Sequence, residues 1–464
     1  MTDASSSKAV KAATRRVVAY GSNVFSQLAA QHLSTSVPQQ YVVQDACRII
    51  RACTFQTVYQ THFGEVRALG ECAHLLDEVL GQMDFSPTNA PQTGTWPVFV
   101  GQDMVEAVLD TRALRCYFLD YIEMKVTTLE MVSPAWTAAA ADGRGRCMAI
   151  DTSGDAFLFD SIQSFQAATD STQHAQDLRD ASRFIPYRYG HDGSLDRYDE
   201  TAQLGNPRPL FRGVEAGNAH FVLSSEPSGK ESSSKQPAIW VFGDARFGAV
   251  PLEPWAGTEL VWKTSCAPAN ATAMDNPLLM PVTADGICRG LDGAGREIAA
   301  GGRHTLVRTS GGRVYGWGWN EDACLRPVAL RAGEASGLMS SIVPEPIRID
   351  ASPSNGPNSD RGAYRVCAAN GRSFVLGAGG LAIAGSNEFG CLALAPDLQG
   401  LEPKPRCERE FSQIKKTYDC VNGFQRHPLL NNDKTQRIVN VHATSLATFI
   451  TLETSGQTHT SEQQ

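Results

Sequence analysis

The sequence contains no apolar run that approaches the ~18 residues of a membrane-spanning helix. Its first sixteen residues are small, polar and mildly basic, and they lack the apolar core of a secretory signal peptide. No two of its 12 cysteines are spaced as CxxC, so neither a zinc ribbon nor a dithiol redox motif is predicted. Without a secretory signal, we expect reduced thiols and a location in the cytoplasm, the nucleus or both.

Motifs for nucleotide or covalent chemistry are also missing. Glycine clusters occur at 290–295, at Gly301-Gly302 and at 377–380, but no Lys-Ser/Thr pair follows at P-loop spacing and no βαβ pattern surrounds them. No paired carboxylates stand in an ordered context. We therefore predict a protein that is not an enzyme, with no catalytic residues, cofactor or metal. An enzyme within the long segments 72–128 or 162–206 remains the competing interpretation.

The charge balance is acidic. A formal net charge of -8 provides no global attraction to nucleic acid or to an anionic membrane, so we expect neither as a direct partner. The composition includes 42% hydrophobic residues, 41 glycines and 24 prolines. This is enough apolar material for a core, and it favours many turns over long helices.

The clearest pattern lies in Arg296–Leu325. An apolar and small-residue run ends at Gly301-Gly302, and an alternating segment covers 303–309. A turn at 310–312 then leads into a second alternating segment, 313–320. Two short strands around a glycine-rich turn predict a β-hairpin. Because a single hairpin is marginally stable alone, the pattern suggests a repeated unit.

The pattern does recur along the chain. Residues 48–70 align with it without a gap, so that Gly70 falls on Gly318. Further copies, one of them split by an insertion and one faded, cover 131–159, 212–243 and 364–392. Half-copies occur at 17–28 and 437–452, which implies that the two ends meet and complete one another. A circular array closed in this way leaves no edge strands, and it predicts an all-β propeller.

This interpretation divides the chain into one domain and two tails. We predict disordered tails at 1–16 and 453–464 and a single propeller at 17–452. Long inter-blade insertions are expected at 72–128, 162–206, 226–237, 251–291, 327–361 and 395–436. A short helix is expected at Ala73–Gln82, and helical spacing occurs in Ser161–Arg183. Two further segments, 96–101 and 115–119, resemble strands. One interpretation is that they belong to a degenerate blade.

His220 and His304 occupy equivalent positions in two repeats. A metal site needs ligands that converge, whereas equivalent positions in separate blades are rotated about an axis. We therefore predict that each imidazole binds neighbouring backbone and holds the strand geometry. In other copies this position is predicted to be Gln56, Arg372 and Ser445. Other structural repeat positions are predicted at Gly217, Gly301, Gly302, Trp317 and Gly318.

Partner contacts are predicted at aromatic and arginine side chains, which dominate binding hot spots. Trp240, Trp317 and Trp319 are expected to pack between blades, and any exposed one to face a partner. Arg246 and Phe247 follow a repeat glycine, where they are either partner anchors or residues that close a turn. The candidate partner-binding residues are therefore Arg246, Phe247, Trp240 and Trp319.

The combined pattern V-x-A-G-x-x-H and G-x-V-Y-x-W-G-x-N-x-x-G-x-L resembles the regulator of chromosome condensation repeat. It is carried by Ile298–His304 with Gly312–Leu325, Val214–His220 with Phe242–Val250, Gly385–Leu392 and Tyr20–Leu28. That family builds seven-bladed β-propellers whose last blade is closed by the N-terminal strands. The resemblance, which spans about 17–452, implies the same architecture here.

The resemblance implies a non-catalytic scaffold that binds a protein partner on a propeller face, and we expect a monomer. One similar subfamily partners a small zinc protein in diphthamide synthesis and Elongator-dependent tRNA modification; Ala19–Asn23 and Ala443–Ile450 are similar to its terminal strands. Another, similar at Gly316–Glu321, is the chromatin-associated partner of a JmjC-type oxygenase. The founding member is a guanine-nucleotide exchange factor for the GTPase Ran. We rank the three roles in this order.

Overall fold

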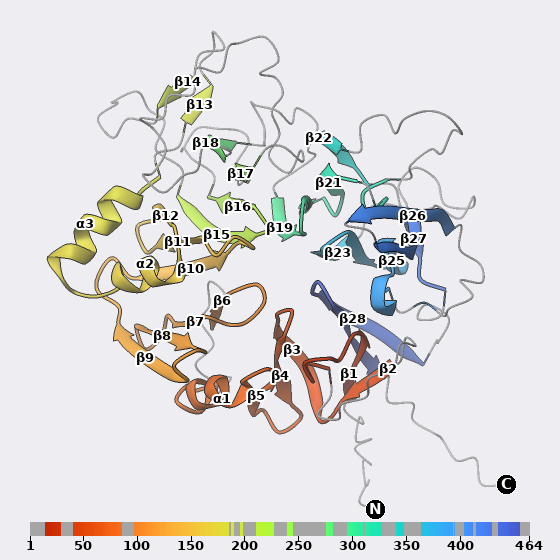
Figure 1. Ribbon diagram of the computed structural model, residues 1–464, viewed down its shortest axis with the longest axis horizontal. Coiled ribbons are helices and arrows are strands. Elements are labelled where there is room, and N and C mark those ends of the chain that lie inside the picture. The colour runs from red at the N-terminus through yellow and green to blue at the C-terminus, as the bar shows by residue number, and fades with distance from the viewer. Residues whose placement is uncertain are drawn as a thin grey trace, which may run out of the picture.

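The computed structural model describes most of the chain between Thr14 and Thr454. The described residues are 14–28, 40–85, 97–184, 187–189, 195–197, 210–226, 239–244, 275–281, 295–309, 311–320, 322–326, 340–347, 363–392, 394, 403–411, 414–428 and 435–454. They form small antiparallel sheets arranged around a central axis (Figure 1). The predicted all-β propeller is therefore confirmed.

The first three sheets of the ring follow one another in chain order. The first contains β3 (Ala46–Ala52), β4 (Gln56–Thr61) and β5 (Val66–Gly70). The second contains β6 (Val98–Val100), β7 (Ala107–Asp110), β8 (Arg115–Asp120) and β9 (Lys125–Glu130). The third contains β10 (Trp136–Ala141), β11 (Cys147–Asp151) and β12 (Ala156–Phe159).

Three larger sheets continue the ring. One contains β15 (Phe211–Ala216), β16 (His220–Ser225), β17 (Ile239–Asp244) and β18 (Asp275–Pro281). The next contains β19 (Gly295–Ala300), β20 (His304–Thr309), β21 (Val314–Trp319) and β22 (Ser340–Pro346). The last, in the order β23-β24-β25-β27-β26, contains β23 (Ala363–Ala369), β24 (Arg372–Gly377), β25 (Gly380–Ser386), β26 (Pro403–Phe411) and β27 (Ile414–Arg426).

The ends of the chain complete the ring in one shared sheet. Its order is β2-β1-β29-β28, with β1 at Thr14–Gly21, β2 at Gln40–Val43, β28 at Gln436–Ala443 and β29 at Ala447–Thr454. Every residue of β1 pairs with a residue of β29, from Thr14 opposite Thr454 to Gly21 opposite Ala447. The predicted closure by terminal half-repeats is confirmed. The described residues contain seven sheets of three to five strands, while seven as the blade count stays a prediction.

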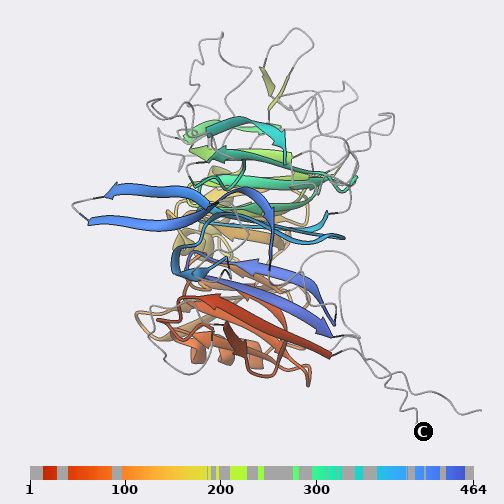
Figure 2. The same ribbon diagram turned by 90° about the vertical axis from the view of Figure 1, so that its right-hand side faces the viewer.

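Few elements of the described residues lie outside the sheets of the ring. These are the helices α1 (Ala73–Gly81), α2 (Ile162–Ala167) and α3 (Gln173–Ser182), the short 3-10 helix η3 (Glu388–Gly390), and a hairpin of β13 (Tyr187–Tyr189) and β14 (Leu195–Arg197). The helices α1, α2 and α3 lie on the outside of the ring, and the β26–β27 hairpin projects beyond one face of the ring in the edge-on view (Figures 1 and 2). No helix in the described parts is long and apolar enough to cross a membrane.

The sequence-based boundaries differ from the structure in two ways. β1 begins at Thr14 and β29 ends at Thr454, so both ladders extend into segments predicted as tails. Several predicted insertions also contain strands of the ring. The β6–β9 sheet lies mostly within 72–128, β18 within 251–291, β22 within 327–361, and β26 and β27 within 395–436.

The hydrophobic core lies between blades, because each apolar cluster draws on two neighbouring sheets. One cluster joins Met148 and Leu158 of the β10–β12 sheet to Phe221 and Phe242 of the next sheet. The second strands, such as β16 and β20, are buried at nearly every residue because they pack on both faces. Each blade therefore depends on both neighbours for the burial that stabilises it.

Closure at β1 predicts a large effect of N-terminal truncation. Deletion of residues 1–28 removes the fully buried Val17, Val18 and Ala19 and leaves β29 unpaired along one edge. At about 1.5–3 kcal/mol for each buried Val side chain, this loss approaches the stability of a typical domain. Differential scanning calorimetry should show a fall in melting temperature of more than ~10 °C, or no folded protein. Deletion of residues 1–13, which spares β1, is the control, and equal melting of both variants would contradict the closure.

Candidate functional site at the inner loops

Each sheet has a loop between its first and second strands, and these loops lie on one face of the ring. We call them the inner loops; they cover 53–55, 101–106, 142–146, 217–219, 301–303, 370–371 and 444–446. Backbone bonds join them across blades. The amide of Asn218 donates to the carbonyl of Gly302 at 2.9 Å, and that of Thr54 to the carbonyl of Gln102 at 3.0 Å. The inner loops thus form one continuous surface.

The residue that follows each inner loop is a buried polar side chain in four of the sheets. These residues are Gln56, His220, His304 and Arg372, each at most 1% exposed and each the first residue of its strand. They face Gly70, Gly243, Gly318 and Gly385 across the sheet. The repeat position identified from the sequence is therefore a single recurring place in the fold.

These side chains bond the next blade in the ring. His220 Nε2 lies 3.0 Å from Thr305 Oγ1, and His304 Nε2 lies 2.9 Å from Ser373 Oγ. Arg372 donates to the carbonyl of Ser445 at 2.9 Å. Both imidazoles therefore meet a side-chain hydroxyl of the following blade, and His304 also bonds the backbone of Arg372; the sequence analysis expected backbone partners.

In two sheets the residue at this repeat position is not the one that the sequence alignment indicated. In the closing sheet the residue opposite Gly21 is Ala447, so the assignment to Ser445 is wrong; Ser445 lies in the inner loop and supplies only its carbonyl. In the β10–β12 sheet the position is taken by Arg146, whose carbonyl accepts from the amide of Asp142 as that of His220 accepts from Gly217. Sequence comparison missed Arg146 because its loop is one residue longer.

No other residue can replace the glycine opposite this position without strain. Gly318 has φ of 110°, and a Cβ there would lie 2.5 Å from the carbonyl oxygen of Arg303. Gly21, Gly70, Gly243 and Gly385 show the same conformation and the same close approach to the preceding inner loop. This approach lets the third strand pack directly against the loop.

Gly318→Ala tests this close approach. It combines an unfavourable φ with a clash against backbone, so the free energy of unfolding should fall by more than ~2 kcal/mol. Gly64→Ala is the matched control, because Gly64 has φ of 87° but nothing within 4 Å of the added Cβ, and it should cost only about 1–2 kcal/mol. Chemical denaturation measures both, and an equal loss would show that the clash contributes nothing.

Burial keeps the two histidines neutral. It lowers the pKa of His220 to about 3, assisted by the charge of His304 and of Arg146 and opposed by Asp244. Burial also lowers the pKa of His304 to about 4, against a hydrogen bond from the imidazole to the backbone of Arg372, which raises the pKa. A histidine in the unfolded chain has a pKa of about 6.5, so below that value the unfolded chain binds more protons.

Acidification should therefore destabilise the protein through these two groups. Between pH 7 and pH 5 the loss should be about 2 kcal/mol for each histidine. A His220→Gln and His304→Gln double variant, which places the glutamine of the first sheet at both positions, should show a flatter fall in the free energy of unfolding. His174→Gln, at an exposed residue of α3, should keep the wild-type pH profile. A double variant as acid-sensitive as the wild type would disprove the role of the imidazoles.

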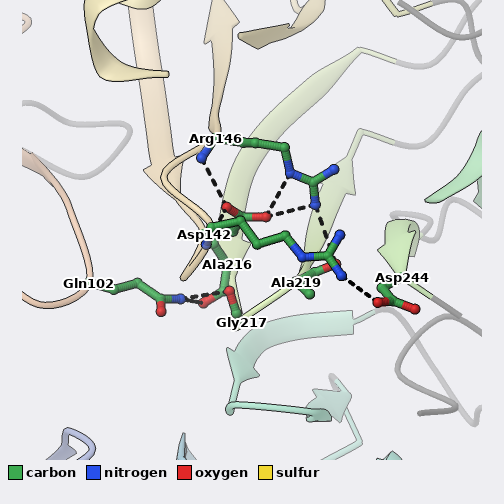
Figure 3. Close-up of polar contacts among 8 residues, drawn as sticks. Gln102, Asp142, Arg146, Ala216, Gly217, Ala219 and Asp244 are labelled. Atoms are coloured by element: carbon green, nitrogen blue, oxygen red, sulfur yellow. Dashed lines mark hydrogen bonds and ion pairs between the residues drawn. The ribbon is translucent and has the colours of Figure 1, made fainter. Parts of the chain in front are cut away.

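The inner loops of the second, third and fourth sheets are joined by a polar cluster (Figure 3). Arg146, which is 4% exposed, binds Asp142 Oδ2 through Nη2 at 2.7 Å and through Nε at 2.9 Å. Arg144 forms an ion pair with Asp244, a buried residue at the end of β17. Gln102 donates to the carbonyl of Gly217 at 2.7 Å. The Arg146–Asp142 pair lies within one inner loop, whereas the Arg144–Asp244 and Gln102–Gly217 contacts each link one blade to another.

The predicted partner-binding residues fall in different environments. Trp240 is 3% exposed, donates to Ser225 Oγ at 3.0 Å and packs edge-on against Phe211. Trp240 is a core residue, as expected for packing between blades, and it offers no exposed surface to a partner. Trp317 is completely buried, whereas Trp319, at the end of β21, is partly exposed. Arg246 and Phe247 lie outside the described residues.

The three predicted loop glycines are constrained by neighbouring inner loops. A Cβ at Gly217 would lie 2.4 Å from the Gly301 carbonyl oxygen, and one at Gly301 would lie 2.8 Å from that of Ala369. A Cβ at Gly302 would lie 2.5 Å from Asn370 Oδ1. These glycines therefore allow successive inner loops to touch.

An asparagine after the third strand has a role that the sequence analysis missed. The amide of Leu325 donates to Asn320 Oδ1 at 2.7 Å, and Leu28 and Leu392 bind Asn23 and Asn387 in the same way. The recurrent spacing of five residues between Asn and Leu was the available signal. Among the described residues, no group of three metal-ligating side chains converges.

The comparisons with known proteins agree with this geometry. The regulator of chromosome condensation (RCC1) repeat model matches residues 296–324, the hairpin that carries His304 and Gly318. No curated protein sequence matches the chain.

Two solved structures of a yeast protein are similar. Yeast RCC1 (Prp20) bound to Kap60 has a TM-score of 0.51 at 13% identity, over 97% of this chain and 91% of that one. Prp20p from Saccharomyces cerevisiae, described with its binding to Gsp1p and histones, has a TM-score of 0.51 at 12% identity, over 97% and 93%. With the matching repeat, these show an all-β propeller of the RCC1 type. The chain therefore has the fold of an RCC1-type propeller and carries one hairpin that matches the RCC1 repeat.

Proposed function

We propose that this protein is a non-catalytic scaffold that binds a protein partner on the face formed by the inner loops. The observation that carries the proposal is the burial of the recurring polar residues. His220, His304 and Arg372 lie between blades and bond the next blade, so they are unavailable for chemistry at the surface. The same face exposes Arg303 and part of Trp319, residue types that are frequent in binding hot spots.

The partner is proposed from the resemblance in the sequence. The first candidate is the small zinc protein of diphthamide synthesis and Elongator-dependent tRNA modification, supported by the terminal segments 19–23 and 443–450. The JmjC-type oxygenase is the alternative, supported by 316–321. Either role places the protein in the cytoplasm or the nucleus.

A second function, nucleotide exchange on a Ran-like GTPase, is favoured by one observation. The chain shares its fold over almost its whole length with yeast RCC1, and one of those structures is described with its binding to Gsp1p. Nucleotide exchange would need no catalytic side chain. It would need only a docking surface that opens the nucleotide site of the GTPase.

Affinity capture on the tagged full chain, followed by mass spectrometry, separates these roles. We expect one protein to be recovered in near-stoichiometric amounts: a small zinc protein, a JmjC protein or a Ran-like GTPase. Arg303→Glu should weaken the capture by tenfold or more, as a reversed charge in an interface does. Arg67→Ala, at an exposed residue of the opposite face, should not.

For the exchange role, release of labelled GDP from purified Ran should accelerate at substoichiometric protein, and an unchanged rate excludes it. Capture of no stoichiometric partner, or capture that Arg303→Glu leaves intact, would contradict the binding face.

A further inference from the structure

The inner-loop face exposes several apolar side chains near the junction of the closing sheet and the first two sheets. Ile122 is 96% exposed and Met124 is 46% exposed in the turn between β8 and β9, and Val24 is 63% exposed after β1. Phe25 and Phe55 are half-buried beside them. Large apolar side chains exposed together on a soluble protein commonly mark a binding surface.

Contacts between neighbouring loops connect these residues into one surface. The rings of Phe25 and Phe55 lie 4.2 Å apart between centroids. The amide of Phe55 donates to the carbonyl of Asp103 at 2.8 Å, which joins the first inner loop to the second. Tyr121 then donates to the carbonyl of Val105 at 2.5 Å, so the turn that carries Ile122 rests on the same loop.

Topology places this turn on the inner-loop face. In the second sheet, β6 leads into the inner loop and β7 leads away from it, so β8 returns to the same face and its turn lies there. By the same reasoning, the β4–β5 turn that carries Phe63 lies on the opposite face. Phe63 is 85% exposed and is a natural control.

The turn holds Ile122 in a fixed position. Asp120 Oδ1 accepts from the amides of Ile122 and Glu123, each at 2.9 Å, and Met124 closes the turn with φ of 52°. The turn itself needs no isoleucine, since polar residues suit such positions better. A turn whose backbone is already fixed loses little conformational entropy when a partner covers it.

Carboxylates surround the apolar side chains. Asp103 and Glu123 are exposed and Glu106 is half-buried, and none of the three forms an ion pair within the described part of the chain. Burial raises the pKa of Glu106, and the charge of Asp103 raises it further. A positive charge on a partner would relieve this repulsion.

We propose that Val24, Phe25, Phe55, Ile122 and Met124, with Asp103, Glu106 and Glu123, form a docking surface for a basic, amphipathic peptide segment of a partner protein. The inference rests on the proposed scaffold function and names its surface and partner chemistry. Lysine or arginine side chains would meet the carboxylates while apolar side chains cover Ile122 and Met124. Nucleic acid and a symmetric second copy are disfavoured because each would bring negative charge against the carboxylates.

Fluorescence anisotropy with the full chain tests the surface directly. The probe is a fluorescein-labelled peptide that alternates lysine with leucine and phenylalanine. We expect saturable binding to the wild type that is weakened about tenfold or more in the Ile122→Ser, Met124→Ser double variant, because both side chains lose apolar burial. Phe63→Ser on the opposite face should bind as the wild type does.

Charge variants test the second half of the proposal. Asp103→Asn with Glu123→Gln should weaken binding several-fold and reduce its dependence on salt. A lysine–serine peptide and a glutamate–leucine peptide should both bind at least about tenfold more weakly than the probe. The proposal is overturned if either control peptide binds the wild type as tightly as the probe does. It is also overturned if the probe binds the Ile122→Ser, Met124→Ser variant as tightly as the wild type, or does not bind the wild type at all.

The same variant separates this inference from the scaffold function. If the wild type and Ile122→Ser, Met124→Ser capture the same protein equally, the scaffold stands and this surface is wrong. A wild type that self-associates by sedimentation, while the double variant is monomeric, would identify a second copy as the occupant and also overturn the peptide proposal.

Discussion

The pairing of β1 with β29 is the constraint on which the ring depends. Their ladder runs the full length of both strands and brings residues more than 400 positions apart into register. Val18 and Ile450 pack toward the preceding sheet, whereas Val17 and Phe449 pack toward the following one. One sheet therefore completes two apolar interfaces at once. Without it, the first and last sheets of the chain would each lose a neighbour.

The buried polar side chains fix the orientation of each blade against the next, which apolar packing alone would leave less specific. Hydrophobic contact has no preferred orientation, but a buried histidine that needs a hydroxyl partner does. His220 and His304 meet Thr305 and Ser373 of the following blades, which fixes how one blade sits against the next. The inner loops are held by these bonds. At the same position of the first sheet, Gln56 accepts from the amide of Val105 at 2.9 Å and so supports the loop on which the Ile122 turn rests.

The sequence predicted the parts of the fold that leave a side-chain signature. Gly318 and its equivalents recur because no other residue fits a positive φ against a carbonyl oxygen, so the repeat was visible wherever that glycine remained. The β6–β9 sheet escaped recognition as a full blade because its strands are short apolar runs, such as Val98–Val100, without the repeat's histidine. The outer strands β18 and β22 lie far from their repeats in sequence, within segments that were interpreted as insertions.

The candidate site was less predictable for a related reason. Which polar residue bonds the next blade depends on loop length, and the longer loop before Arg146 shifted that position out of the alignment. The burial of Trp240 depends on the neighbouring Phe211, which no local pattern shows. The exposure of Ile122 likewise follows from the turn direction in the folded sheet.

Native-state hydrogen exchange tests most directly whether the ring is one cooperative unit. The amides of Val18 in β1, Val222 in β16 and Leu306 in β20 belong to three separate sheets, and all three residues are fully buried. If closure makes each blade depend on the others, these amides should exchange only through global unfolding, with one free energy and one denaturant dependence. Separate free energies for the sheets, with that of β1 far below the rest, would contradict the account.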